Sequence, residues 1–177
     1  MNRERRAAYT LLFHMLKEAG LTADEPGTRA WRQCFELGTG PCGKPELLHN
    51  KKGWHFNLSH SGRFAACVVS DRPVGIDVED ASLRRTMDFR RIASRFFTGR
   101  EACWVEEEDS LHRFLQLWTR KESFLKCSGE GLRRDLKSFD VLPGRSEADG
   151  SFLETNLGGA FLCVCLSADG RRPAILT

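Results

Sequence analysis

The order of helix-like and strand-like segments in the 177 residues predicts an α+β protein. Residues 6–19 repeat apolar side chains at helical spacing, and Gly20 is a plausible end for that helix. Short apolar runs of strand length follow, helical segments come next, and strand-like runs return near the C-terminus. This order indicates an α+β protein with two related halves, although no tandem sequence repeat is visible.

The other elements follow from the same periodicities. Residues 21–53 are rich in glycine and proline and predict turns. Ser110 is a suitable N-cap, and Gly129 a suitable end, for one longer helix. The predicted strands are residues 54–58, 64–70, 74–79, 138–142, 152–155 and 161–167. The predicted helices after the first are residues 86–97, 100–107 and 110–127.

Composition argues against several classes of protein. The net charge is only +3, and the basic residues occur as scattered pairs such as Arg84-Arg85, which we expect on solvated faces; this argues against a nucleic-acid binder. Seven cysteines without CxxC spacing do not indicate a disulfide framework or a zinc site, and they fit a reducing cytoplasm. No apolar run is long enough to span a membrane, and the N-terminus lacks a signal-peptide cleavage site.

Two carboxylates share one face of the predicted strand at 74–79. Because side chains alternate along a strand, Ile76 and Val78 face one side while Asp77 and Glu79 face the other. Two carboxylates this close repel each other unless water or a cation separates them. An exposed edge of an antiparallel sheet explains the pattern equally well.

A third carboxylate, Glu122, lies in the apolar stripe of the predicted helix 110–127. That stripe consists of Leu111, Phe114, Leu115, Trp118 and Leu125. The polar side of the helix is expected to carry His112, Arg113, Gln116, Thr119, Arg120 and Ser123. A carboxylate in an apolar stripe needs either an ion pair or a metal. Lys126, one turn further on, is placed to meet a phosphate or to pair with Glu122.

A third segment, FNLSHSG at residues 56–62, places Ser59, His60 and Ser61 where a strand meets a turn. Hydroxyls, an imidazole and free backbone N–H groups suit an anion, although an ordinary turn histidine is the alternative. The carboxylates of the previous two segments are hard oxygen donors, which magnesium prefers together with water and substrate phosphates.

These segments resemble the signatures of the 4′-phosphopantetheinyl transferase superfamily. The matching strings, in order, are GKP, FNLSHSG, GIDVE, RFFTGRE and WTRKESFLKCSGEGL. Their spacing is similar to that of the larger type, which activates peptide and polyketide synthetases.

The resemblance implies two similar α+β halves related by a pseudo-twofold axis, with coenzyme A bound in the cleft between them. We place the halves at residues 1–73, the coenzyme A side, and 74–177, the magnesium and carrier-protein side. Members of this type usually begin with a strand and a basic segment, so the N-terminal half is expected to lack its first strand and to bind coenzyme A more weakly.

The resemblance also implies roles for single residues. The expected magnesium ligands are Asp77, Glu79 and Glu122. The residues expected to contact coenzyme A are Lys44, Ser59, His60, Lys126 and Arg5, with Arg6 as the alternative to Arg5. The region after Gly129 is expected to meet the carrier protein.

The implied reaction moves the phosphopantetheine group of coenzyme A to a serine of an acyl or peptidyl carrier protein and releases 3′,5′-ADP. We assign Glu122 as the base, with Glu79 as the alternative, and Lys126 and His60 as groups that offset phosphate charge. A cytoplasmic monomer is expected. A non-catalytic binding module for coenzyme A or a carrier protein is the alternative function, and a magnesium-dependent phosphohydrolase or nuclease is a third.

Overall fold

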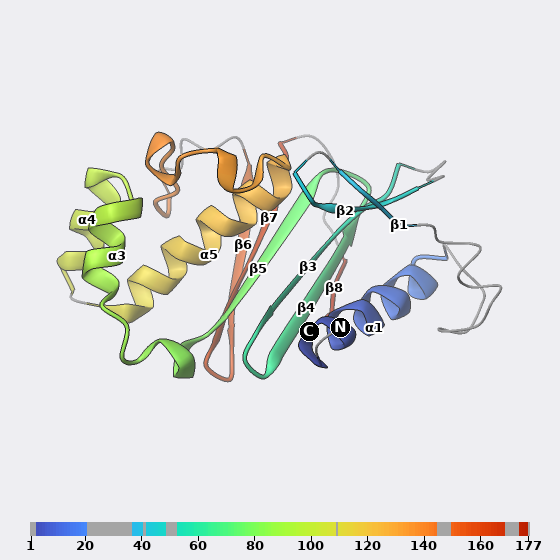
Figure 1. The fold of residues 1–177 in the computed structure, drawn as a ribbon, viewed down its shortest axis with the longest axis horizontal. Helices are drawn as coiled ribbons and strands as arrows, with labels where there is room; N and C mark the ends of the chain where they lie inside the picture. The colour runs from blue at the N-terminus through green and yellow to red at the C-terminus, as the bar shows by residue number, and fades with distance from the viewer. Residues whose placement is uncertain are drawn as a thin grey trace.

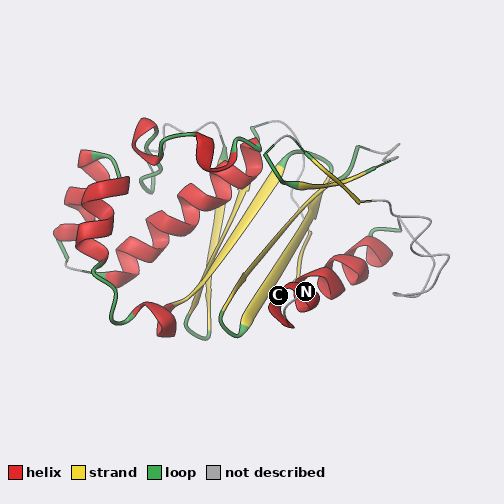
Figure 2. Ribbon diagram, viewed as in Figure 1, coloured by secondary structure: helices red, strands yellow, loops and turns green. Residues whose placement is uncertain are grey.

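A computed structural model describes residues 3–20, 37–40, 42–48, 53–108, 110–144, 150–168 and 174–176. Much of the predicted turn-rich segment, including residues 21–36, lies outside these ranges. Strands occupy the middle of the molecule and helices its two outer sides (Figure 2). The mixed helix-and-sheet architecture predicted from the sequence is therefore confirmed.

The N-terminal layer consists of helix α1 (Arg3–Glu18) packed on a three-stranded antiparallel sheet. The sheet has the order β3 (His55–Ser61), β4 (Phe64–Ser70), β8 (Ala174–Leu176), so the last strand of the chain pairs with the N-terminal part. The buried side chains of α1 recur at helical spacing, and Leu12 and Leu16 contact Phe56 and Val69 of the sheet. A small two-stranded sheet, β1 (Leu37–Thr39) and β2 (Pro45–Leu47), lies at one end of this layer (Figure 1).

The C-terminal layer is built on a second antiparallel sheet. Its strand order is β5 (Val74–Asp80), β7 (Ala160–Leu166), β6 (Ser151–Leu157). Helix α5 (Leu111–Ser128) lies against this sheet, and α3 (Phe89–Phe96) and α4 (Gly99–Glu106) lie outside α5 (Figure 1). The 3-10 turns are η1 (Ala81–Arg84), η2 (Gly131–Arg133) and η3 (Leu136–Ser138).

Helix α5 is buried on more sides than its apolar stripe predicts. Thr119, Arg120 and Ser123, which the sequence assigns to a polar side, are all buried. The assignment was wrong because α5 has the sheet on one side and the α3–α4 layer on the other. The hydroxyls of Thr119 and Ser123 donate to helix carbonyls, which satisfies them in this position.

Residues 138–142 do not form the predicted strand. The segment begins in η3 and then runs alongside α4 and α5 without joining a sheet. Lys121 Nζ donates to the carbonyls of Leu136 and Phe139, and Glu101 Oε1 accepts from the N–H of Val141. Side chains thus form the hydrogen bonds with these backbone groups that a neighbouring strand would otherwise form.

The two sheets meet along β3 and β5, which are joined by side chains rather than by a backbone ladder. Oxygens of Asn57, Ser59 and Ser61 on β3 accept hydrogen bonds from successive outward N–H groups of β5, at 2.9, 3.2 and 3.1 Å. Every second residue of β3 therefore faces β5. This seam places Ser59 and Ser61 beside the carboxylates of β5.

Candidate active site

Asp77 lies at the centre of the candidate site, on the middle of β5. Its neighbours Ile76 and Val78 pack into the apolar core on the other face, as the alternation predicts, so the carboxylate is turned toward α5 and β3. One oxygen, Oδ1, accepts from Lys126 Nζ at 2.6 Å and from Ser59 Oγ at 3.0 Å. The other, Oδ2, is buried and has no hydrogen-bond partner among the described residues.

Lys126 reaches this carboxylate from the last turn of α5. Its ammonium group also donates to Ser59 Oγ and to the carbonyl of Ile76, at 3.2 and 3.1 Å. The spacing in the sequence also allowed Lys126 to pair with Glu122, but the observed ion-pair partner of Lys126 is Asp77. Lys126 thus joins α5 to both β5 and β3.

Gly75 allows the helix to come this close. A Cβ atom at residue 75 would lie 2.0 Å from the carbonyl oxygen of Ser123 and 2.4 Å from the backbone nitrogen of Cys127. Only glycine fits under the last turns of α5, so this residue sets the height at which Lys126 meets the strand.

Glu122 lies one turn before Lys126 and is half-buried. Burial raises the pKa of its carboxyl, and the charges of Asp77 and Glu79 raise it further, whereas Lys126 opposes them. The three carboxylates named from the sequence are therefore near enough to influence one another. They are not gathered into a preformed cage, since no group of three metal-ligating side chains occurs in the described part of the chain.

Glu79 is held by an arginine that the sequence did not single out. Arg84 donates to both carboxylate oxygens, at 2.9 to 3.1 Å, and Ser61 Oγ adds a contact to Oε2 at 3.0 Å. Arg84 is partly exposed, as expected, but it also pairs with Glu79 because the 3-10 turn η1 directly follows β5. No local pattern signals this pair.

The donor set suits a hard divalent cation. Oδ2 of Asp77 is a buried carboxylate oxygen without a hydrogen-bond partner among the described residues, and Glu122 supplies further carboxylate oxygens nearby. The carboxylate of Glu79, the third predicted ligand, already pairs with Arg84.

His60 and Arg5 lie on a different side of β3. Because residues alternate, Ser59 faces Asp77 while His60 faces α1, where its Nδ1 is 3.4 Å from Glu4 Oε2. Arg5 follows Glu4 on the exposed surface of α1, with its guanidinium 5.8 Å from the ring centre of Tyr9. These two predicted phosphate contacts share a neighbourhood but do not touch the Asp77 cluster.

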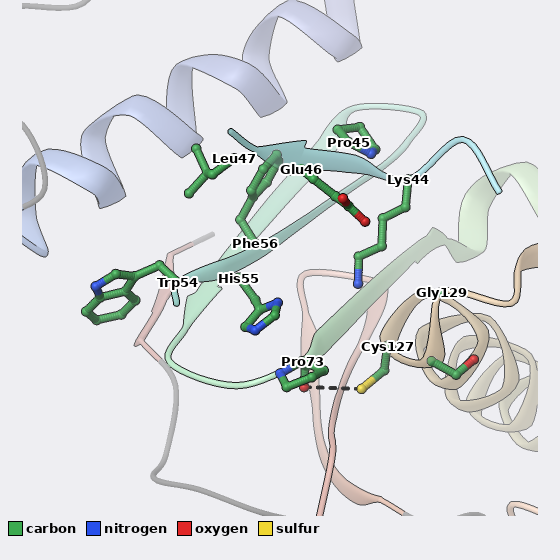
Figure 3. Close-up of a pocket in the computed structure, with 11 residues that line it drawn as sticks. Lys44, Pro45, Glu46, Leu47, Trp54, His55, Phe56, Pro73, Cys127 and Gly129 are labelled. Atoms are coloured by element: carbon green, nitrogen blue, oxygen red, sulfur yellow. Dashed lines mark hydrogen bonds between the residues drawn. The ribbon is translucent and has the colours of Figure 1, made fainter. Parts of the chain in front are cut away.

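Lys44 reaches the opposite end of the seam. Its ammonium group donates to the carbonyls of Lys126 and Val74, at 2.6 and 3.0 Å, and burial lowers its pKa. It points from the β2 region toward the end of α5 and lines a cavity of about 310 Å³ (Figure 3). A neighbouring cavity of about 230 Å³ is shared by Lys44 and Lys126.

The family of this chain follows from a comparison with known protein families. A sequence model described as the 4′-phosphopantetheinyl transferase superfamily matches residues 73–174, more than half of the chain. The chain belongs to the 4′-phosphopantetheinyl transferase superfamily. The matched segment contains Asp77, Glu79, Glu122 and Lys126, and the resemblance inferred from the signature strings is confirmed.

Three relatives carry the same family name. The chain is 42% identical over 110 residues to a 4′-phosphopantetheinyl transferase of Bacillus subtilis, covering 60% of this chain and 47% of the relative. It is 39% identical over 110 residues to 4′-phosphopantetheinyl transferase Sfp of Bacillus subtilis strain 168, with the same coverage. It is 39% identical over 88 residues to 4′-phosphopantetheinyl transferase gsp of Aneurinibacillus migulanus, covering 48% and 35%. The chain therefore spans half or less of the length of these relatives.

In the described residues of this superfamily member, no helix is both long and apolar enough to cross a bilayer.

Proposed function

We propose that this chain transfers the 4′-phosphopantetheine group of coenzyme A to a serine of an acyl or peptidyl carrier protein, with magnesium, and releases 3′,5′-ADP. The observation that carries the proposal is the contact of Lys126 with Asp77 and Ser59, beside the unpartnered Asp77 Oδ2. A cation, a diphosphate and a positively charged side chain can meet there. Relatives named 4′-phosphopantetheinyl transferase support the same activity.

Magnesium would be held by Asp77, Glu122 and Glu79. When bound, it would neutralise diphosphate charge and act as a Lewis acid. The remaining chemistry belongs to side chains of the chain itself.

Glu122 is the better candidate for the base that takes the serine proton. In the metal-free protein, burial and the charges of Asp77 and Glu79 raise its pKa, so it holds a proton more tightly than an ordinary carboxylate does. Glu79 is the weaker candidate, because both of its oxygens already accept from Arg84. The serine oxygen attacks the β-phosphorus of coenzyme A, its proton passes to Glu122, and the bond to the leaving 3′,5′-ADP breaks.

The basic groups would bind the rest of coenzyme A. Lys126, already directed at the cluster, would donate to the diphosphate, and Ser59 would orient both Lys126 and Asp77. His60 and Arg5, near the start of α1, would bind the 3′-phosphate. Lys44 would lie toward the nucleotide end, where it lines the two cavities described above.

We also propose the finer organisation implied by the family. Each of the two sheets is three-stranded, antiparallel and covered by a helix, and the sheets meet at the β3–β5 seam, which supports a pseudo-twofold relation with a boundary between residues 73 and 74. The return of β8 to the first sheet is a crossing between the halves. A monomeric state, a cytoplasmic location and carrier-protein contact after Gly129 stay predictions.

The test is incubation of the chain with coenzyme A, magnesium and an apo carrier protein, followed by intact mass spectrometry of the carrier. We expect the mass gain of one phosphopantetheine group, its loss when the metal is chelated, and its loss in Asp77→Ala. Coenzyme A binding without a mass gain would indicate the binding module instead. Cleavage of the diphosphate without transfer would indicate a phosphohydrolase.

A further inference from the structure

A cavity lies at one end of the β3–β5 seam, and His60 lies at the other end. The cavity of about 310 Å³ is walled by the start of β3, by Pro73 before β5 and by the end of α5, and Asp77 is not among its lining residues (Figure 3). Its volume is at the lower end of the range for small-molecule sites. The aromatic side chains Trp54 and Phe56 and the charged Lys44 line it.

The thiol of Cys127 forms part of this wall. It donates to the carbonyl of Pro73 at 3.3 Å, the contact drawn in Figure 3. A second thiol, Cys165 on β7, is fully buried in the same apolar cluster as Cys127. Two cysteines distant in sequence therefore lie in one cluster, and of the two only Cys127 lines the cavity.

Gly75 brings the two cysteines close to each other. Residue 75 is the register partner of Cys165 across β5 and β7, and its missing side chain lets the backbone of Cys127 descend onto the strand. Cys127 and Cys165 are thus both neighbours of this glycine, one on the helix above it and one on the adjacent strand. Disulfides need a close approach of the two Cβ atoms, and two cysteines beside the same glycine are placed for this approach.

The two thiols differ in reactivity. The hydrogen bond from Cys165 lowers the pKa of Cys127, burial opposes this, and the positive charges of Lys44 and Arg72 lower the pKa further. The pKa of Cys165 is raised, first by the hydrogen bond with Cys127 and then by burial. Cys127 lines the cavity and is placed to react first, whereas Cys165 does not line it and is placed to react second.

We propose that Cys127 and Cys165 form a modification site for low-molecular-weight disulfides, with Cys127 as the thiol that reacts through the cavity and Cys165 as the resolving thiol. The Cys127 thiolate attacks one sulfur of the disulfide, whose S–S bond breaks, and one thiol leaves with the proton given up by Cys127. The Cys165 sulfur then attacks the Cys127 sulfur, and the second thiol leaves with the proton of Cys165. Two protein thiols are oxidised and one small disulfide is reduced to two thiols.

The product would tie the last turn of α5 to β7. Cys127 directly follows Lys126, so the link is formed in the same helical turn that carries the ammonium group on Asp77. This inference does not depend on the proposed transferase reaction, because its readout is the state of the cysteines.

The experiment treats the chain with oxidised glutathione, in a background where Cys34, Cys42 and Cys103 are replaced by serine. We expect a mass loss of two hydrogens, about 2 Da, and a peptide linking Cys127 to Cys165, both reversed by dithiothreitol. Cys165→Ala should stop at one glutathione adduct on Cys127. Cys127→Ala should leave Cys165 reduced, and Cys163→Ala, a buried neighbour on the same strand that does not line the cavity, should react like the parent.

A second measurement needs none of these last three substitutions. During brief exposure of the folded background protein to iodoacetamide, Cys127 should be alkylated at least roughly tenfold faster than Cys163 or Cys67, whose pKa values burial raises to about 12. Equal alkylation rates at these cysteines, a linked peptide that does not contain Cys127, or unchanged oxidation in Cys127→Ala would overturn the proposal. So would the absence of any reaction with oxidised glutathione.

Discussion

Arg84 occupies both carboxylate oxygens of Glu79, through three hydrogen bonds of 2.9 to 3.1 Å. The carboxylate is buried and the arginine is partly exposed, with 10% and 38% of their side chains accessible. A cation that binds Glu79 therefore shares its carboxylate with a guanidinium group, and the two positive charges repel each other.

We predict that Arg84→Ala raises the magnesium affinity of the chain. The partly exposed pair is worth about 1 kcal/mol after solvent screening, which corresponds to roughly a fivefold lower dissociation constant. Isothermal titration with magnesium in the absence of coenzyme A measures this directly. Arg85→Ala is the matched control and should leave the affinity unchanged; equal or weaker binding in Arg84→Ala would show that Arg84 does not weaken magnesium binding.

A second prediction concerns the ion pair of Lys126 and Asp77. Lys126→Met leaves a buried carboxylate without its cation, which lowers the free energy of unfolding by roughly 1–3 kcal/mol. Asp77→Asn combined with Lys126→Met should recover much of that loss, since neither charge then remains. Urea unfolding of both single variants and the double variant measures the coupling. Simple additivity of the two single effects would contradict the pair.

The pH dependence of stability tests the environment of Glu122. Its folded pKa is raised above the ordinary value of 4.5 by burial and by Asp77 and Glu79. Below the ordinary value both the folded and unfolded forms are protonated and Glu122 has no penalty. As the pH rises from 4.5 through the raised pKa of the folded protein, the Glu122 carboxyl becomes charged in its buried position. The free energy of unfolding therefore decreases over this pH range.

Glu122→Gln should therefore raise the free energy of unfolding at neutral pH in metal-free protein and have little effect near pH 4. Urea unfolding at a series of pH values, with a chelator present, measures it. Glu106→Gln, at an exposed position in α4, is the control and should follow the parent profile. A parent-like profile for Glu122→Gln would mean that the carboxyl is solvated.

Lys121 differs in role from Lys126, although both occur in the WTRKESFLK string. Its ammonium group lies 2.8 Å from Glu101 Oε2 with both side chains almost fully buried. Lys121→Met should lower the free energy of unfolding by roughly 3–5 kcal/mol, because it leaves the Glu101 charge buried without a partner. Thermal and urea unfolding measure this, and Lys137→Met, at an exposed site, is the control. A loss below about 1 kcal/mol would mean that Glu101 is neutral or resolvated in the variant.

Local patterns predicted much of the fold. The alternation at 74–79 correctly predicted that Ile76 and Val78 face the core and that Asp77 faces the other side. This could be predicted locally because successive side chains on a strand point to opposite faces. The caps of α5 were equally local: the Ser110 side chain accepts from Arg113, and Gly129 adopts a left-handed conformation at φ 74°. The predicted strand at 138–142 failed, since the apolar residues there pack beside a buried ion pair rather than beside another strand.

The choice of partners was decided by tertiary structure. From spacing alone Lys126 can pair with Glu122 one turn away, but Gly75 lowers α5 onto β5 and brings Asp77 within 2.6 Å instead. The same packing brings Cys127 to Cys165, and the fold of η1 brings Arg84 to Glu79. The sequence by itself determined the family, the main elements and the set of chemical groups, because these depend on composition and local periodicity. Only the tertiary structure decided which of those groups meet, because contacts between residues distant along the chain depend on how the helices and sheets pack.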